Sequence, residues 1–310
     1  MTAKFWMITN RNREGKALGS KRDALSFYTV DKAMPTGGTK ISDMTPYWEK
    51  VSPSDFRKQL QEVADGFPEV PETAHEKQKH ITLFIHGYNN TWDDAARRYQ
   101  DIVSRLYSGA NGLGTCILFN WPSNGKAIGY LPDREDARDT APDLSAVFNT
   151  LYEQAALMQR KADDGTAVCK AKVSVIAHSM GNYVLQNALN YTWAKQNKPL
   201  LMSLINQCLM VAADVDNDLF GTGESVEHGD GEGIANLCYR VSALYSGRDS
   251  VLGMSSGVKH FGKRRLGRSG LDRTVQQPDN ICDFDCSPLF TAKESNIHSA
   301  YFWTPPSSNS

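Results

Sequence analysis

The segment Val173-Ser-Val-Ile-Ala-His-Ser-Met-Gly-Asn182 decides the fold, because it predicts a buried strand that runs directly into a helix with a serine at the joint. Placing Ser179 on so sharp a turn forces a strained backbone. Side chains two residues before and after the serine would collide there, so both positions must be small, as Ala177 and Gly181 are. Glycine is more usual at the first of these positions, and alanine adds one methyl group without removing the steric logic. We therefore expect the Ser179 hydroxyl to stand above a sheet.

Short apolar runs alternate with longer helical patterns along the rest of the chain, which is typical of a mostly parallel central sheet with helices on both faces. The predicted strands are Phe5–Thr9, Ala24–Val30, Ile81–Ile85, Cys116–Phe119, Val173–Ala177, Leu204–Ala213, Tyr239–Tyr245 and Ile281–Cys286. The predicted helices are Ser54–Ala64, a helix from its cap Thr91 to Leu106, a helix from Leu144 to Met158, and Ser179–Lys195. We expect an α/β fold in one domain over residues 1–302, in which residues 1–70 form an extension of strands and loops. A disordered tail is expected at 303–310.

Composition, charge and hydropathy argue against several classes of protein. The 310 residues include 34 Lys and Arg against 35 Asp and Glu, so bulk electrostatics do not favour binding to nucleic acid or to an anionic membrane. The N-terminus lacks the basic and apolar regions of a secretory signal, and no apolar run approaches the roughly 20 residues that span a bilayer. We expect a soluble, cytoplasmic protein with no nucleic-acid partner.

Three stretches between the predicted elements have the composition of loops. Pro35–Thr39 is rich in Gly, Pro and Thr, and residues 221–235 are Gly-rich and acidic, which predicts a mobile excursion between strands. The basic stretch Lys259–Arg273 is interpreted as a solvated loop.

No metal site is predicted. The spacing Asp214-x-Asp216-x-Asp218 resembles the start of a calcium loop, but Leu219 and Ser225 occupy the positions that need Gly and Glu. Cys282 and Cys286 would lie about 13 Å apart in an extended strand, too far for a disulfide, and are interpreted as thiols. We expect no cofactor.

A serine needs a general base to act as a nucleophile at neutral pH, and the base is usually histidine. Of the seven histidines, four precede Ser179, and His228 precedes Asp249, the acid that we favour below. In this strand–turn–helix arrangement the chain order is serine, acid, histidine. His298 follows the last predicted strand, where a short loop can place it over Ser179, so we predict His298 as the base and keep His260 as the alternative.

Two acidic residues follow strands after Ser179, where an acid that orients the histidine must lie. Asp249 ends the segment Tyr245-Ser-Gly-Arg-Asp249, and Asp214 follows the strand before it. We choose Asp249 because the later strand is the more frequent site in this architecture. Asp214 stays open, because motif order alone does not separate the two. The acid would orient the imidazole and stabilise its protonated form.

Two backbone N–H groups are expected to stabilise a developing oxyanion. The N–H of Met180 lies at the start of a helix, and the second donor is assigned to Tyr88, in the loop that follows the strand Ile81–Ile85. Gly87 permits close backbone approach, and His86 is interpreted as a structural histidine that braces this loop. The predicted substrate-binding residues are Gly87, Tyr88, Trp121 and His178.

Taken together, these motifs resemble a bacterial α/β-hydrolase family first catalogued only as a domain of unknown function. The matching segments are Thr9-Asn-Arg11, His86-Gly-Tyr-Asn-Asn90, Asn120-Trp-Pro-Ser-Asn-Gly125 with Tyr130 and Asp133-Arg134, Ala177-His-Ser-Met-Gly-Asn182, Ala213-Asp214 and His298-Ser-Ala-Tyr301. The resemblance spans roughly residues 1 to 302 and implies an α/β-hydrolase fold with a catalytic triad of Ser179, Asp249 and His298. It implies no substrate, and residues 221–235 have no counterpart in it.

The function expected from these residues is hydrolysis of carboxylic esters with short or medium acyl chains through an acyl-enzyme. The expected partner is therefore a small ester or acyl compound. Acyl transfer, or hydrolysis of a thioester or amide, would use the same triad and stays open as an alternative. A scaffold with an inert triad is the non-enzymatic alternative, although such a scaffold would usually lack one of the three residues.

Overall fold

The computed structural model describes residues 5–30, 41–42, 47–69, 74, 77–109, 111–123, 130–163, 171–195, 203–221, 230–256, 263–291 and 296–302, with the backbone alone over 152–163. The chain divides into two compact units, one of residues 1–136 and 149–174 and the other of residues 137–148 and 175–310. That they form a single domain stays a prediction. The predicted loop at Pro35–Thr39 and the predicted tail at 303–310 lie outside the described residues.

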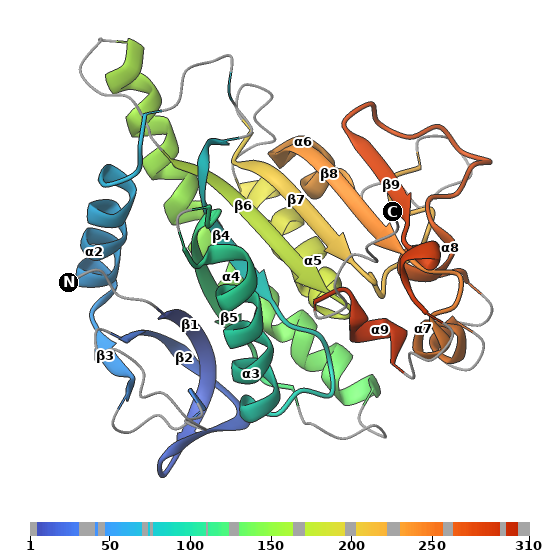
Figure 1. Ribbon diagram of the computed structural model, residues 1–310, viewed down its shortest axis with the longest axis horizontal. Helices are drawn as coiled ribbons and strands as arrows, with labels where there is room; N and C mark the ends of the chain where they lie inside the picture. Colours follow the sequence, from blue (N-terminus) through green and yellow to red (C-terminus); the bar gives the residue numbers. More distant parts are fainter. Residues whose placement is uncertain are drawn as a thin grey trace. The chain divides into compact units, whose positions relative to one another are not determined.

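The first unit is built on strands in the order β3-β2-β1-β5-β4 (Figure 1). These strands are β1 (Phe5–Glu14), β2 (Ala17–Val30), β3 (Glu49–Val51), β4 (Lys79–Ile85) and β5 (Gly114–Asn120). β1 pairs in parallel with β5, and β5 pairs in parallel with β4. The carboxyl ends of parallel strands meet at one edge, so Asn120, paired with Thr9, ends β5 beside the loop that follows Ile85.

Strands β1 and β2 form a longer hairpin than the sequence predicts. They pair antiparallel from Phe5 opposite Val30 to Glu14 opposite Ala17, with register shifts between Thr9 and Arg13. Gly15, with φ of 59°, forms the turn, a conformation that glycine adopts without steric cost. The first expected strand ended early and the second began late, because the outer part of the hairpin is exposed and polar and lacks the apolar alternation on which the prediction relied.

The first unit carries the helices α2 (Pro53–Asp65) and α3 (Trp92–Ile102), which continues into the π-helical turn η2 (Val103–Tyr107). Thr91 caps α3 as predicted. Its hydroxyl accepts the N–H of Asp94 at 3.2 Å, and the Asp94 carboxylate accepts the N–H of Thr91 at 3.1 Å. This reciprocal pair is a capping box, which fixes where the chain leaves the loop after β4.

Helix α4 (Tyr130–Asp163) begins earlier than the predicted start at Leu144. The residues before Leu144 are mostly polar, and Pro142, which removes a helical hydrogen bond, lies inside the helix. Ala137, Ala141, Leu144 and Phe148 are all buried at helical spacing. Burial of this stripe therefore outweighs the proline, and the helix continues through it.

The second unit carries strands in the order β6-β7-β8-β9 (Figure 1). These are β6 (Ala171–His178), which enters the unit at residue 175, β7 (Ile205–Val211), β8 (Cys238–Tyr245) and β9 (Ile281–Asp285). β7 pairs in parallel with β8, and β8 with β9. The helices are α5 (Gly181–Lys195), α6 (Glu232–Leu237), α7 (Ser250–Met254), α8 (Leu266–Ser269) and α9 (Ile297–Ala300), with a short turn η5 (Ser287–Leu289).

Two of the predicted loops contain structured segments. The Gly-rich stretch ends in α6, whose Ile234 and Leu237 are fully buried, while residues 222–229 lie outside the described part. The interpretation of Lys259–Arg273 as a solvated loop is wrong for its second half. Arg265 is only 1% exposed and is followed by α8. Its carboxylate partners lie about 50 residues earlier in the chain, so local composition could not reveal them.

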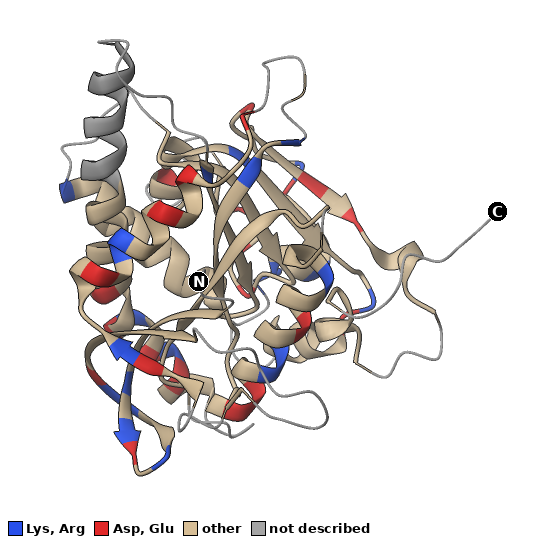
Figure 2. Ribbon diagram, turned by 60° about the vertical axis from the view of Figure 1, so that its left-hand side comes forward, with Lys and Arg blue, Asp and Glu red and all other residues tan. Residues whose placement is uncertain are grey.

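Charged residues of both signs are interspersed over the described ribbon (Figure 2). This mixture agrees with the near-zero net charge of the sequence. In the described part of the chain, no helix has the length and hydropathy needed to cross a membrane.

Candidate active site

Ser179 lies at the joint between β6 and α5, in the strained conformation that the sequence predicts. Its φ is 54°, a value that a residue other than glycine adopts at a cost of roughly 1–3 kcal/mol. Three backbone contacts hold it there. The Ser179 N–H donates to the Val211 carbonyl at 3.0 Å, and the Ser179 carbonyl accepts the N–H groups of Asn182 at 3.0 Å and Asp214 at 3.2 Å. The Asn182 side chain also bonds the carbonyls of Ala177 and Ser179.

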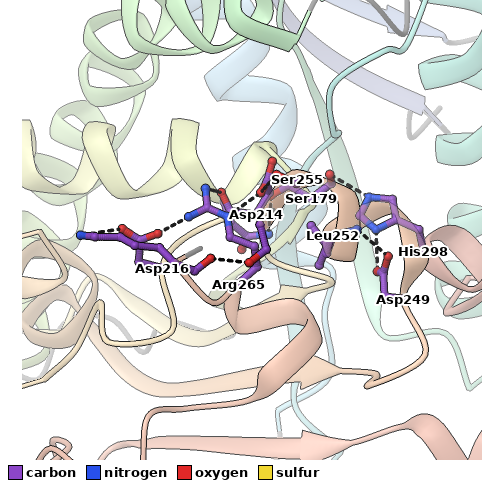
Figure 3. A network of polar contacts seen from close by, with 11 residues as sticks. Ser179, Asp214, Asp216, Asp249, Leu252, Ser255, Arg265 and His298 are labelled. Atoms are coloured by element: carbon purple, nitrogen blue, oxygen red, sulfur yellow. Dashed lines mark hydrogen bonds and ion pairs between the residues drawn. The ribbon is translucent and has the colours of Figure 1, made fainter. Parts of the chain in front are cut away.

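His298, in α9, lies against the Ser179 hydroxyl (Figure 3). Its Nε2 is 2.8 Å from Ser179 Oγ, and its Nδ1 is 2.7 Å from Asp249 Oδ2. Because a carboxylate only accepts hydrogen bonds, Nδ1 carries the proton. Nε2 is then free to accept the hydrogen of the Ser179 hydroxyl, which is the orientation that a general base needs.

Asp249 is fully buried and is fixed at both carboxylate oxygens. Oδ2 faces His298, and Oδ1 accepts the N–H of Leu252 at 3.0 Å, so the same side chain caps α7 (Figure 3). This second contact holds the carboxylate in place with a neutral donor, which leaves its charge available to the imidazole. The structure therefore brings together Ser179, His298 and Asp249, and their catalytic roles are taken up as a proposal below.

Asp214, the alternative acid, is engaged elsewhere. Its Oδ1 accepts Arg265 Nε at 2.8 Å and the hydroxyl of Ser255 at 3.1 Å (Figure 3). Its backbone N–H still contacts the Ser179 carbonyl, so Asp214 lies near the nucleophile turn through its main chain. His260, the alternative base, lies outside the described residues.

His178 is buried beside His298 and contacts its backbone. The His178 Nε2 is 2.8 Å from the His298 carbonyl oxygen, and the two rings lie 5.0 Å apart. Phe302 packs edge-on against His178 with ring centroids 5.3 Å apart. These contacts make His178 a support for the segment that carries His298, a role that sequence reasoning missed. Its predicted contact with substrate stays a prediction.

Met180 follows the strained serine and is fully buried, with its N–H at the entry to α5. The other residues predicted to bind substrate or oxyanion, Gly87, Tyr88 and Trp121, belong to the first unit, and these roles stay predictions. Trp121 is fully buried, and its indole N–H donates to the His86 carbonyl at 2.7 Å. The indole therefore packs against the loop that follows β4.

A buried arginine organises the loop that contains Gly87 and Tyr88. Arg11 donates from Nε to the Asn120 side chain at 2.9 Å and from Nη2 to the Asn90 carbonyl at 2.9 Å. Its Nη1 donates to the carbonyls of Gly19 and Ser123 at 3.0 and 3.2 Å. Burial lowers the pKa of Arg11 to about 9, although the Asp133 charge opposes this shift. In the sequence, this role of Arg11 was indicated only by the family motif Thr9-Asn-Arg11.

His86 braces the same loop, as its sequence context suggested. Its Nδ1 is 2.8 Å from the Gly87 carbonyl oxygen, and its Nε2 is 3.1 Å from Asn120 Oδ1. Its ring stacks on Trp121 with centroids 5.3 Å apart. Burial, followed by the nearby Arg11 charge, lowers the pKa of His86 to about 3.

This shift predicts a loss of stability in mild acid. The unfolded chain takes up a proton at the ordinary histidine pKa of 6.5, whereas folded His86 stays neutral down to about 3. Between these values the unfolded state binds more protons, so stability should fall by about 1.4 kcal/mol per unit as pH drops below about 6. Urea unfolding of wild type and His86→Gln across this range measures the effect. The glutamine variant should show a flatter acid slope, and identical slopes would contradict the assignment.

The described residues contain no group of three or more His, Cys, Asp and Glu side chains that could hold a metal ion. The carboxylates of Asp214 and Asp216 both accept hydrogen bonds from the guanidinium of Arg265. Cys282 and Cys286 are free thiols, as expected. Burial also raises the pKa of the Cys286 thiol, which keeps it protonated.

Mostly parallel strands with helices and a serine on the turn after β6 define the class of α/β hydrolases. The chain belongs to the family described as "Alpha/beta hydrolase of unknown function (DUF900)", whose model matches residues 69–302. A relative of this chain is the uncharacterized protein alr1448 of Nostoc sp. strain PCC 7120, with 27% identity over 135 residues. That match covers 37% of this chain and 32% of the relative, so it spans about a third of the relative's length.

Solved structures of lipases and esterases are also similar. Aspergillus fumigatus lipase B has 14% identity and a TM-score of 0.35, over 84% of this chain and 56% of the lipase. A fungal esterase from Rhizomucor miehei has 9% identity and a TM-score of 0.31, over 68% of this chain and 67% of the esterase. An esterase from Pyrobaculum calidifontis has 10% identity and a TM-score of 0.31, over 67% of each chain.

Proposed function

We propose that this protein is a serine hydrolase that cleaves carboxylic esters with short or medium acyl chains. One observation carries the proposal, namely that His298 Nε2 lies 2.8 Å from Ser179 Oγ while its Nδ1 lies 2.7 Å from Asp249 Oδ2. A hydroxyl, an imidazole and a carboxylate in this order form the arrangement that activates serine for acyl transfer. Three chain segments far apart in the sequence supply these groups.

Acylation begins when Ser179 Oγ attacks the ester carbonyl carbon and its proton passes to His298 Nε2. The imidazolium that forms is stabilised by the Asp249 carboxylate, which does not take the proton. The carbonyl oxygen becomes an oxyanion, and the N–H of Met180 at the start of α5 is the donor proposed from the second unit. The tetrahedral intermediate then collapses. Nε2 gives its proton to the departing alcohol, and the acyl group stays on Ser179.

Deacylation repeats these steps with water as the nucleophile. His298 Nε2 takes a proton from water as the oxygen attacks the acyl carbon, and returns that proton to Ser179 Oγ when the acid leaves. The chemistry needs these three side chains and a backbone donor. The preference for short or medium chains follows the sequence, in which no long apolar segment that could serve as a lid is evident.

The proposal is tested with a fluorophosphonate probe and a series of p-nitrophenyl esters from acetate to palmitate. We expect stoichiometric labelling of the wild type, and kcat/KM values that are highest between acetate and octanoate. Labelling without turnover of any ester would move the substrate to a thioester, an amide or an acyl acceptor other than water. Failure of both assays in a folded sample would contradict a serine hydrolase and favour an inert scaffold.

A further inference from the structure

A short segment of the second unit, residues 264–268, runs along the chain that follows β7. We call it the Arg265 clasp. Arg265 forms an antiparallel bridge with Asp216. The N–H of Leu266 donates to the Val215 carbonyl at 2.9 Å, and the N–H of Gly267 donates to the Ala213 carbonyl at 2.9 Å. The clasp therefore extends along the segment that leaves the nucleophile turn.

The guanidinium of Arg265 binds this segment with three of its nitrogens (Figure 3). Nε donates to Asp214 Oδ1 at 2.8 Å, Nη2 donates to the Asp214 carbonyl at 3.3 Å, and Nη1 donates to Asp216 Oδ1. Ser255 adds a hydrogen bond to the same Asp214 oxygen. The planar guanidinium spreads its donors far enough to bind the side chain and the main chain of one residue together with a second carboxylate, whereas the compact ammonium of lysine does not reproduce this geometry.

The segment held in this way contacts Ser179 directly. The Asp214 N–H donates to the Ser179 carbonyl at 3.2 Å, and the Val211 carbonyl accepts the Ser179 N–H at 3.0 Å. Between them, Ala212 has φ of 45°, so the backbone beside the serine is strained as well. Gly267 packs so closely here that a Cβ on it would lie 2.2 Å from the Ala212 carbonyl carbon.

The other face of the clasp contacts the loop that carries Asp249. The Gly267 carbonyl accepts the N–H of Ser246 at 3.1 Å, and the Ser246 carbonyl accepts the N–H of Asp249 at 3.0 Å. The guanidinium of Arg268 donates to the Asp249 carbonyl. One five-residue segment therefore joins the backbone of the nucleophile turn to the backbone of the acid loop.

We propose that Arg265 is a positioning residue, which sets the Ser179 turn relative to the Asp249–His298 pair through Asp214. The proposal rests on the function proposed above. A buried ion pair is weak support for stability, because desolvation of two charges offsets much of their attraction. Its value here is geometric, since a displacement of about 1 Å between reacting groups can lower a rate about 100-fold.

The kinetic test uses Arg265→Gln, Arg265→Lys and, as the matched control, Arg273→Gln. Arg273 forms an ion pair with Asp283 at 2.6 Å in the same unit, and its side chain is 70% exposed. We expect both Arg265 variants to lose about 10- to 100-fold in kcat and in the rate of fluorophosphonate labelling, with KM nearly unchanged. The control should keep the wild-type values. Wild-type rates in folded Arg265 variants would overturn the proposal.

A double variant, Arg265→Gln with Asp214→Asn, separates positioning from charge balance. It removes the charges of Arg265 and Asp214 while keeping polar side chains, and Asp216 keeps its ion pair with Lys263 at 3.5 Å, so the variant should recover most of the melting temperature lost in Arg265→Gln. Positioning predicts that kcat stays low, because the fork that fixes Asp214 is still missing. Recovery of both melting temperature and kcat to wild-type values would overturn the proposal in favour of simple charge neutralisation.

A spectroscopic readout tests the geometry even without turnover. The proton on His298 Nδ1, held by Asp249, should give a low-field resonance in the proton NMR spectrum of the wild type. We expect this resonance to shift or broaden by exchange in Arg265→Gln and not in Arg273→Gln. A shift in a protein that fails to react with the probe would sustain the positioning role and reject the hydrolase. An unchanged resonance would reject the positioning role, whatever the outcome of the labelling.

Discussion

Replacing His298 by alanine is expected to lower kcat toward p-nitrophenyl esters by on the order of 10⁴- to 10⁶-fold. In the wild type, His298 Nε2 lies 2.8 Å from Ser179 Oγ. The alanine variant has no base at this position to accept the serine proton. Binding of the ester should change less than kcat, because the imidazole acts mainly in the transition state. Steady-state kinetics of the purified variant, with circular dichroism to establish folding, measure this effect.

His80→Gln is the matched control for this prediction. His80 is a part-buried histidine of the first unit, and its Nδ1 lies 2.7 Å from the Ser174 hydroxyl. The control should keep the wild-type kcat. A folded His298→Ala variant with kcat near that of the wild type would show that another group removes the serine proton.

Replacing Asp249 by asparagine is expected to lower kcat by about 10⁴-fold with little change in the structure around it. The asparagine amide can still accept the Leu252 N–H. It can also donate to His298 Nδ1, which favours the tautomer with its hydrogen on Nε2. In that tautomer the imidazole cannot accept the Ser179 proton. The ester assay and the NMR resonance of the Nδ1 proton both report on this change.

Asp214→Asn should behave differently, which makes the pair of variants informative. It removes the carboxylate that Arg265 Nε contacts at 2.8 Å and leaves a buried guanidinium partly uncompensated. We expect a loss of stability of about 3 kcal/mol and a kcat reduction of only about 10- to 100-fold. The reverse order, with Asp249→Asn near wild type and Asp214→Asn nearly inactive, would make Asp214 the acid.

The nucleophile turn could be predicted from sequence because its determinants are local. Ala177 and Gly181 are small for steric reasons that act within five residues of Ser179, and the strand before it and the helix after it are both visible in the pattern. The chain order of acid and base then left few histidines, of which His298 lies against Ser179 in the structure. Short-range rules of this kind carry over directly from sequence to structure.

The sequence alone could not decide whether Asp249 or Asp214 is the acid. Both follow parallel strands of one sheet, and both are buried in the structure. They differ in their partners, because the Asp214 carboxylate is bound by the guanidinium of Arg265, which lies 51 positions after it in the chain. Arg265 itself stands in a run of basic residues with the composition of an exposed loop, so no local signal marked it as buried.

Helix α4 and the role of Arg11 illustrate the same limit. Pro142 argued against a helix that begins as early as Tyr130. The helix continues through this proline because it buries a stripe of side chains from Ala137 to Phe148. Arg11 lies in β1, and its guanidinium bonds to Asn90 in the loop after β4 and to Asn120, the last residue of β5. Propensity describes neighbours along the chain, whereas these features depend on partners brought together by folding.

The most direct measurement is the position of the covalent label after reaction with a fluorophosphonate. Proteolysis and mass spectrometry of labelled wild type should place the phosphonyl group on the peptide that contains Ser179, and the Ser179→Ala variant should take up no label. A hydroxyl activated by His298 requires that result. Label on a different residue, or undiminished labelling of Ser179→Ala, would contradict Ser179 as the nucleophile.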